Sequence, residues 1–303
     1  GIEFEEDDFN RRFDAALAEL QKQSGIGKTE RKSEASPIYA EVLDAVGKNV
    51  FRGYETTEVE DATVVAILDG EKRVDALSEG EQGGVVLDNT PFYAESGGQV
   101  GDTGVFVGER ENHSVSETLT PLLSKEGSRT KAILSKEGSL MKAVVTDTYS
   151  PAAGLIIHKI KVEKGTVKIG DSVSARVNVE KRDAARRNHT ATHLLHAALK
   201  EVLGTHVKQA GSVVAPNYLR FDFTHYQPMS AAEIAEVEDL VNRHILQNEP
   251  VTTDLMALED AMRSGAVAMF GEKYGAEVRV LSVGNGEFSR ELCGGTHVRA
   301  TGD

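Results

Sequence analysis

Two histidines in one predicted helix are the first candidates for metal chemistry. Residues 180–203 contain neither Pro nor Gly and are followed by Gly204, which predicts one helix that ends at a glycine. His189 and His193 are four residues apart, so their rings lie on the same side, one turn from each other. The alternative is an ordinary solvated polar face. The predicted apolar face is opposite, on Ala184, Ala191, Leu194, Leu195, Ala198 and Val202.

A second pair of potential ligands follows much later in the chain. Cys293 is the only cysteine, and four residues separate it from His297 across Gly294-Gly295-Thr296. Two glycines disfavour a helix but permit a tight loop that directs both side chains to one point. One thiolate and three imidazoles suit Zn²⁺. The sequence therefore predicts one zinc ion bound by His189, His193, Cys293 and His297.

The sequence argues against two other kinds of enzyme. A zinc protease helix needs Glu directly after its first His, and Thr190 occupies that position. The stretch Ser96–Gln99 is rich in glycine but lacks the Lys and the strand–helix context of a nucleotide-binding loop. The sequence leaves two arrangements open. All four ligands bind and give a closed structural site, or one ligand is loose and admits water.

Composition is that of a globular protein with an acidic surface. The 303 residues suggest two domains, and no run is long and apolar enough to span a bilayer. One Cys fits a reducing compartment, and the acidic start lacks the layout of a signal peptide. The net charge of −14 argues mildly against nucleic acid, but local distribution decides. Basic residues do cluster in sequence around the predicted His helix: Lys181, Arg182, Arg186, Arg187, Lys200, Lys208 and Arg220.

The periodicity of the chain changes at two places. Residues 5–23 predict an amphipathic helix, 24–35 a polar linker, and Ser36-Pro37 the start of a short helix that ends at Gly47. From 49 to 179 short strands alternate with turns, including a hairpin at Asp69-Gly70, which predicts a small barrel. The duplicated Ser-Lys-Glu-Gly-Ser at 124–128 and 135–139 is expected to be a loop.

The last part mixes strands and helices. Strands are predicted at 218–223, 251–255, 278–283 and 288–292. Helices are predicted from the capping box at Ser230 to about Gln247, and from 258 to 264. The expected fold class is α+β: an N-terminal helical segment, a small β-barrel, and an α/β core with helices on a mostly antiparallel sheet.

The two ligand motifs together resemble the editing domain of alanyl-tRNA synthetases. Free-standing alanyl-tRNA editing proteins share that domain, and the editing domain of threonyl-tRNA synthetase is a distant relative. The resemblance runs from about Pro37 to Asp303 and is closest to bacterial-type enzymes, whereas 107–142 match nothing recognisable. Supporting stretches are 90–102, 203–213, 219–223 and 270–274.

The resemblance implies a domain layout and a function. Residues 1–48 would come from the preceding tRNA-binding part, 49–179 would be a barrel with an insertion near 107–142, and 180–303 a C-terminally truncated editing core. The activity would be proofreading hydrolysis of mischarged Ser-tRNA(Ala) and Gly-tRNA(Ala), without aminoacylation. Expected partners are the acceptor end of tRNA(Ala) and the rest of the synthetase, with no membrane. We expect a monomeric cytoplasmic fragment, an organellar form being an alternative.

The resemblance also suggests residues that contact the substrate. Thr90 matches a threonine placed to meet the hydroxyl of misattached serine, and Gln209 matches a pocket residue that orients water or the ester. With Cys293 they are the catalytic candidates. Their alternatives are a strand-end Thr and a surface Gln. His196 is expected beside the metal site or at the surface. Further substrate-binding candidates are Gly97, Gly98, Gln99, Arg186, Arg187 and Arg220.

Two other functions fit the same residues. One is a zinc-stabilised tRNA-binding module without chemistry, in which loss of one ligand would cost stability. The other is a truncated fragment without catalytic activity, because the chain ends six residues after His297.

Overall fold

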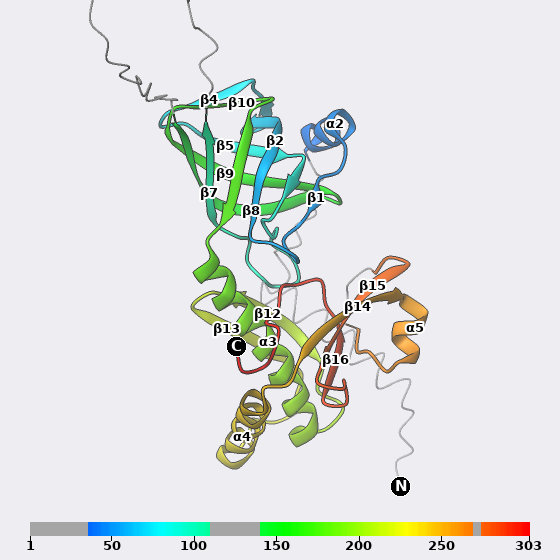
Figure 1. The fold of residues 1–303 in the computed structure, drawn as a ribbon. Helices are drawn as coiled ribbons and strands as arrows, with labels where there is room; N and C mark the ends of the chain where they lie inside the picture. The colour runs from blue at the N-terminus through cyan, green and yellow to red at the C-terminus, as the bar shows by residue number, and fades with distance from the viewer. Residues whose placement is uncertain (1–35, 110–139, 269–273) are drawn as a thin grey trace, which may run out of the picture. The chain divides into compact units, whose positions relative to one another are not determined.

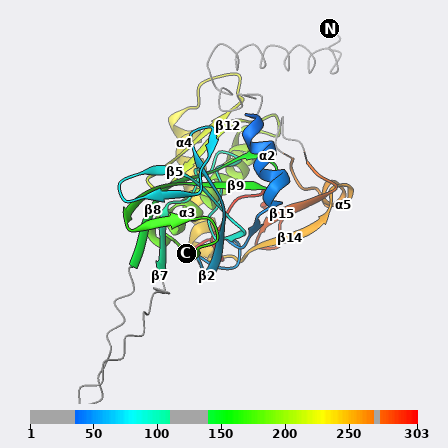
Figure 2. The ribbon, with the colours of Figure 1, turned by 90° about the horizontal axis from the view of Figure 1, so that it is seen from above.

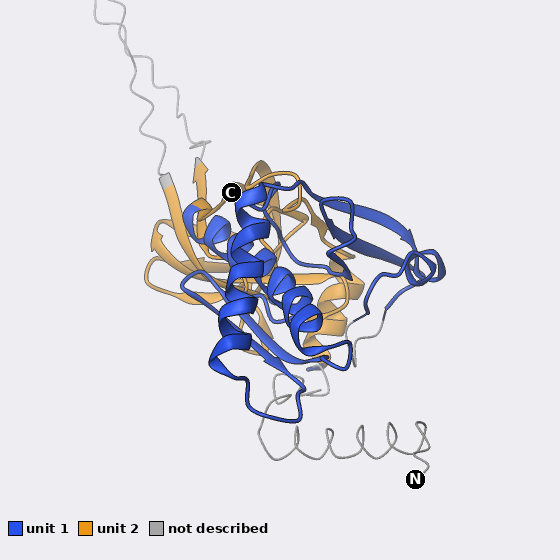
Figure 3. Cartoon of the chain, turned by 90° about the horizontal axis from the view of Figure 1, so that it is seen from below, with its two compact units in different colours: residues 1–36, 95–100, 180–303 blue, residues 37–94, 101–179 orange. Residues whose placement is uncertain are grey.

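The computed structural model describes residues 36–109, 140–268 and 274–303. The chain forms two compact units (Figure 3): a barrel unit, Pro37–Ala94 with Gly101–Val179, and a core unit that includes Glu95–Val100 and Glu180–Asp303. Three sequence predictions lie outside the described residues: the helix at 5–23 with its linker, the loop containing the duplicated pentapeptide, and most of the 270–274 stretch.

Six strands close the predicted barrel. Their order is β11-β7-β8-β9-β5-β2, and β11 pairs back with β2, where Val173 faces Ala62. All of these pairings are antiparallel. The strands are β2 (Glu58–Asp69), β5 (Gln82–Leu87), β7 (Gly104–Glu109), β8 (Leu140–Ala152), β9 (Leu155–Lys164) and β11 (Ser172–Val177).

The hairpin at Asp69-Gly70 is confirmed, and its second strand is short. β3 (Lys72–Arg73) pairs with β2 for only two residues. The chain then leaves β2, and β4 (Ala76–Ser78) pairs with β10 (Thr166–Lys168). β5 pairs along the other edge of β2, and on the edge that β3 shares, β11 pairs with an earlier part of β2. The parallel pair β1 (Val50–Phe51) and β6 (Asn89–Thr90) was not predicted.

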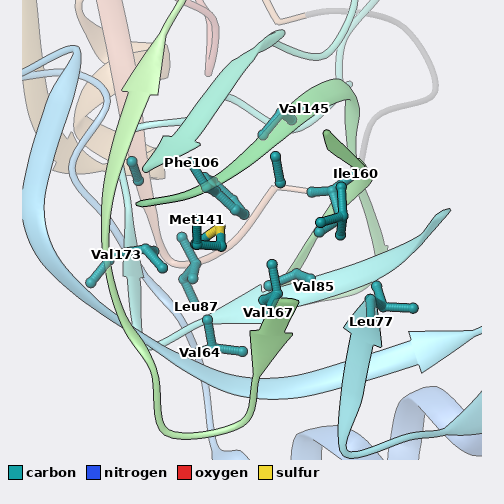
Figure 4. Packing of buried hydrophobic residues seen from close by; sticks show 14 of the residues in the cluster. Val64, Leu77, Val85, Leu87, Phe106, Met141, Val145, Ile160, Val167 and Val173 are labelled. Atoms are coloured by element: carbon teal, nitrogen blue, oxygen red, sulfur yellow. The ribbon is translucent and has the colours of Figure 1, made fainter. Parts of the chain in front are cut away.

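The barrel interior is apolar because every second residue of each strand points inward. Figure 4 shows Phe106, Met141, Ile160, Val85 and neighbouring side chains filling this space. Helix α2 (Pro37–Val46) lies against the outside of the barrel (Figures 1 and 2). Its residue Val42 is buried there against a second apolar cluster that contains Leu68, Val86, Leu155 and Ile157.

The core unit is built around helix α3 (Val179–Leu203), followed by the hairpin of β12 (Gln209–Ala215) and β13 (Tyr218–Phe223). Helix α4 (Ala231–Gln247) begins with the predicted capping box at Ser230. The antiparallel sheet β14-β15-β16 comprises Val251–Ala257, Glu277–Val283 and Ser289–Leu292, and α5 (Leu258–Arg263) joins its first two strands. The predicted α+β fold class is confirmed. In the described part of the chain, no helix combines the length and apolar character needed to cross a membrane.

Candidate metal centre

Helix α3 is buried on both sides, so the solvated face considered from the sequence is wrong. Ala198 and Leu199 join a cluster with Val237 and Leu240 of α4. On the other side the side chains of the histidine face are at least 95 % buried: Arg182, His189, His193 and His196. Polar groups on a buried face need partners, and the contacts of these histidines show what this face binds.

Strand β16 brings the second pair of candidate ligands, Cys293 and His297, to α3. The N–H of Cys293 donates to the carbonyl of Arg279 in β15, so β15 holds the cysteine backbone at the sheet edge. The chain then turns through Gly294 and Gly295. Cys293 Sγ lies 3.2 Å from His297 Nε2 and 3.5 Å from His189 Nε2. One donor atom from each of His189, His193, Cys293 and His297 lies within 4.8 Å of all the others.

Two distances between donor atoms of this cluster are close to those of a tetrahedral metal site. In protein zinc sites the Zn–S and Zn–N distances are about 2.0–2.3 Å, which places neighbouring donor atoms roughly 3.3–3.8 Å apart. The two measured sulfur–nitrogen distances, 3.2 and 3.5 Å, are close to these values. His193 Nε2 is buried and has no hydrogen-bond partner among the described residues. A bound cation would satisfy that nitrogen, and the four residues together could hold a metal ion.

The other ring nitrogen of each histidine is held by a separate residue. His189 Nδ1 donates to Gln99 Oε1 at 2.8 Å, and His193 Nδ1 lies 2.7 Å from Glu291 Oε2. His297 Nδ1 lies 3.2 Å from Thr190 Oγ1. Such contacts fix the ring orientation of metal ligands and are typical of metal-binding histidines.

Gln99 reaches the cluster from a tight turn. Ser96 and Gln99 pair across Gly97 and Gly98, both of which have positive φ. The turn packs on β12, where Val214 N–H donates to Gly98 O at 2.7 Å. The amide of Gln99 is fully buried: its Oε1 accepts from both Thr296 N–H and His189 Nδ1–H, and its Nε2 donates to Thr296 Oγ1.

The cluster favours an ionised thiol. Burial alone would raise the pKa of Cys293, but favourable electrostatic interactions of the thiolate with the rings of His189, His297 and His193 outweigh it and hold the pKa well below its usual range. Burial lowers the pKa of His297 to about 3, although Cys293 opposes the shift. Burial would also lower the pKa of His193, but the charges of Glu291 and Cys293 outweigh it and raise that pKa to about 10, so a bound cation would have to displace a proton from this ring. Burial would raise the pKa of Glu291, but the charge and hydrogen bonds of His193 and His196 lower it to about 2. A thiolate and neutral imidazoles are the forms that bind metals.

Comparisons with known proteins identify the family. The model for class II (A) tRNA synthetases matches residues 2–181. The model for the second additional domain of threonyl and alanyl tRNA synthetases matches 278–303, the segment that carries Glu291, Cys293 and His297. An alanine–tRNA ligase of a Chelativorans species is 44 % identical over 100 % of this chain and 31 % of its own length. That of Parvibaculum lavamentivorans is 45 % identical over 96 % and 30 %.

This chain belongs to the alanyl-tRNA synthetase family. It spans about 30 % of the length of the curated relatives that it matches. A third relative, the alanine–tRNA ligase of Myxococcus xanthus, is 45 % identical over 96 % of this chain and 29 % of its own length.

Thr90 and Gln99, which the family resemblance suggested as substrate contacts, use their polar side chains in hydrogen bonds within the protein. Thr90 is fully buried in the barrel unit, where its Oγ1 lies 2.7 Å from His158 Nε2 and accepts from Phe92 N–H. Gln99 is committed to His189 and Thr296. Gln209 begins β12 and is half-buried, and its Oε1 has no hydrogen-bond partner among the described residues.

The suggested arginines differ in exposure. Arg187 is exposed on α3, whereas the half-buried Arg186 pairs with Asp183 at 3.0 Å. Arg220 is exposed on β13 and pairs with Asp222. Arg182 is 1 % exposed and therefore cannot belong to the basic surface around α3.

Sequence reasoning missed Glu291 and the roles of Thr190 and Thr296. A signal for Glu291 was present: it precedes Cys293 by two residues in a predicted strand, so both side chains point to one face of the sheet. Thr190 was considered in the sequence only because a zinc protease would need Glu at that position, although Thr190 directly follows the candidate ligand His189. His196 is buried and hydrogen-bonded to Glu291, beside the cluster.

Proposed function

We propose that this chain is the proofreading part of an alanyl-tRNA synthetase, and that it hydrolyses mischarged Ser-tRNA(Ala) and Gly-tRNA(Ala) at a zinc centre. The observation that carries the proposal is the convergence of His189, His193, Cys293 and His297. Two of these ligands lie in the segment that matches the second additional domain shared by threonyl and alanyl tRNA synthetases. Zinc is the ion of choice because three imidazoles and a thiolate are its usual tetrahedral ligands.

Ester hydrolysis needs little catalytic machinery. An aminoacyl ester is already activated, so a positioned water and a stabilised oxyanion suffice. A bound zinc ion would supply a Lewis acid at this site. The chain's own residues contribute the rest: Gln99, Glu291 and Thr190 hold the ligand rings in fixed orientations. Gln209 brings a buried oxygen that still lacks a partner and could orient water or the ester.

The partner is the acceptor end of tRNA(Ala), with the remainder of the synthetase chain supplying further contacts. The exposed Arg187, Lys208 and Arg220 of the core unit support a surface that meets phosphates, although Asp222 already pairs with Arg220. Because the chain carries a net charge of −14, we expect weak binding that moderate salt abolishes.

One observation favours a second candidate, a zinc-stabilised tRNA-binding module. All four donor atoms converge, and closed four-ligand sites are typical of structural zinc. In that case the ion would join α3 to residues 293–297 and perform no chemistry. The two functions make different predictions for activity at full metal occupancy.

The test is release of serine from preformed Ser-tRNA(Ala) by this chain and by Cys293→Ala, with zinc measured in both samples. The proposal predicts that the parent contains one zinc per chain and releases serine, and that the folded variant does neither. A parent that is folded and holds zinc but releases no serine would support the tRNA-binding module instead. A variant that releases serine as fast as the parent would exclude the metal centre from the reaction.

A further inference from the structure

Glu291 connects two histidines of α3 through one buried carboxylate. It is 3 % exposed in strand β16, with Oε2 2.7 Å from His193 Nδ1 and Oε1 2.8 Å from His196 Nδ1. Only His193 belongs to the metal cluster. We propose that Glu291 is a positioning residue of the metal centre, which sets the tautomer of His193 and supplies the negative charge that neutralises a divalent ion. This inference rests on the metal centre proposed above.

The first part of the argument concerns the proton on His193. An ionised carboxylate only accepts hydrogen bonds, so His193 Nδ1 must carry a hydrogen that it donates to Glu291. In the neutral imidazole Nε2 then holds the lone pair. Nε2 is buried and has no hydrogen-bond partner within the described chain, so it is the atom left to bind a metal. Glu291 therefore fixes both the direction and the binding form of this ligand.

The second part concerns buried charge. A divalent cation bound by one thiolate and three neutral imidazoles would retain a net charge of +1. An uncompensated charge is costly to bury. The partners of the other two rings, Gln99 and Thr190, are neutral. Among the described residues, Glu291 is the only carboxylate hydrogen-bonded to a ring of the cluster, and its charge brings the buried group to zero.

His196 holds the carboxylate in place. It lies three residues after His193 on α3, is 3 % exposed, and occupies Glu291 Oε1. Its ring packs on Phe221 with the centroids 5.3 Å apart. Because one oxygen is fixed by a histidine outside the cluster, the other is directed at the ligand. His196 thus acts through Glu291, and its effect on the metal should be smaller than that of Glu291 itself.

The test measures metal affinity rather than hydrolysis. Zn²⁺ affinity is determined by competition with a chromophoric chelator, and Co²⁺ binding by absorption, on the whole chain. The variants are Glu291→Gln, which removes the charge with little change of shape, and His196→Asn, which keeps a donor near the position of Nδ1. The matched control is Glu249→Gln, because Glu249 forms the same kind of pair with His244 (Oε2 to Nδ1, 2.8 Å) and is not in the cluster.

We expect Glu291→Gln to bind Zn²⁺ about 10- to 100-fold more weakly and to shift the Co²⁺ absorption bands. His196→Asn should lose less than Glu291→Gln, and Glu249→Gln should match the parent. If Glu291→Gln does not fold, Glu291→Asp takes its place, because aspartate keeps the charge but is too short to reach both histidines. A purely structural role would lower stability without moving the Co²⁺ spectrum of the folded protein.

The outcomes separate this inference from the proposed function. A parent that binds Zn²⁺ with an affinity that Glu291→Gln leaves unchanged would overturn the role of Glu291 and leave the metal centre intact. Where Glu291→Asp takes its place, an unchanged affinity would overturn the positioning of His193 by Glu291. A parent that binds no Zn²⁺ would overturn both the role of Glu291 and the metal centre. Weaker binding in Glu291→Gln, with Glu249→Gln unchanged, would support the inference whether or not the chain releases serine.

Discussion

The backbone of Gly295 lies directly against the ring of His189. A β-carbon built on Gly295 would stand 2.1 Å from Cε1 of that imidazole and 3.1 Å from Gln99 Oε1. The second glycine of the Cys-Gly-Gly-Thr-His loop is therefore required by the close approach of a metal ligand. The first is not, because a β-carbon on Gly294 would meet nothing within 4 Å.

The two adjacent glycines provide a matched pair of variants. Gly295→Ala should abolish tight zinc binding, because the new methyl group forces His189 away from Cys293 and breaks its hydrogen bond to Gln99. Gly294→Ala should keep zinc affinity within about threefold of the parent, since its site is open. Zinc titration of both folded proteins decides the matter. Equal affinities for the two variants would show that the loop is not seated against His189 in solution.

Gln99 should control metal affinity although it does not contact the metal. Gln99→Ala leaves the Nδ1–H of His189 and the N–H of Thr296 without their acceptor. Loss of such a contact typically weakens metal binding about 10- to 100-fold. An unpaired buried group also costs roughly 1–3 kcal/mol of stability. Chelator competition and denaturant unfolding measure the two effects.

The control for this variant is Gln247→Ala, at the exposed end of α4. It removes the same side chain from the same unit and should change neither quantity. If Gln99→Ala also bound zinc like the parent, the hydrogen bond to His189 would have no part in holding the ligand.

Thr90 should behave as a structural residue of the barrel unit. Its hydroxyl is shared between His158 and the N–H of Phe92, so Thr90→Val should cost about 1–3 kcal/mol, the usual penalty for unpaired buried groups. Thr90→Ser keeps the hydroxyl and should cost less. Unfolding in urea measures both. If Thr90→Val instead kept full stability and lost only the preference for Ser-tRNA(Ala), contact with the substrate hydroxyl would be its role.

His158 should make the barrel unit sensitive to acid. Burial lowers its pKa from 6.5 to about 4, although its hydrogen bond to the carbonyl of Val85 opposes the shift. The unfolded chain therefore binds a proton at a higher pH than the folded one. Stability is unaffected above about pH 6.5, falls as the pH drops from 6.5 towards 4, and loses about 3 kcal/mol in total.

The matched variant for this effect is His158→Gln, which has no titrating group there. The difference in unfolding free energy between parent and variant should change across pH 6.5 to 4 and stay constant above pH 7. A difference that does not depend on pH would mean that His158 titrates alike in the folded and unfolded chain.

The strands of the barrel and the helices of the core unit follow from local patterns. Alternating apolar residues, the turn at Asp69-Gly70 and the capping box at Ser230 act over a few residues, so the sequence reports them directly. The convergence of the four candidate metal ligands was also predictable, because their spacing and their chemistry agree. The short pairs β4–β10 and β1–β6 were not, since two or three residues carry no periodicity and their partners are remote in the chain.

The surroundings of the ligands were harder to predict for a related reason. Gln99 and His189 are separated by 90 residues, and Glu291 and His193 by 98. No local pattern links such pairs. A solvated histidine face on α3 was the alternative considered from the sequence because polar side chains usually are exposed, and only the tertiary contacts show that this face is buried.

The measurement that tests the account most directly is serine release from Ser-tRNA(Ala) by one preparation in three states: as purified, after removal of metal by a chelator, and after return of one equivalent of Zn²⁺. Circular dichroism is used to check whether the metal-free chain is still folded. The account predicts that hydrolysis is lost with the metal and recovered with zinc. Serine release at the full rate by folded, metal-free protein would contradict it.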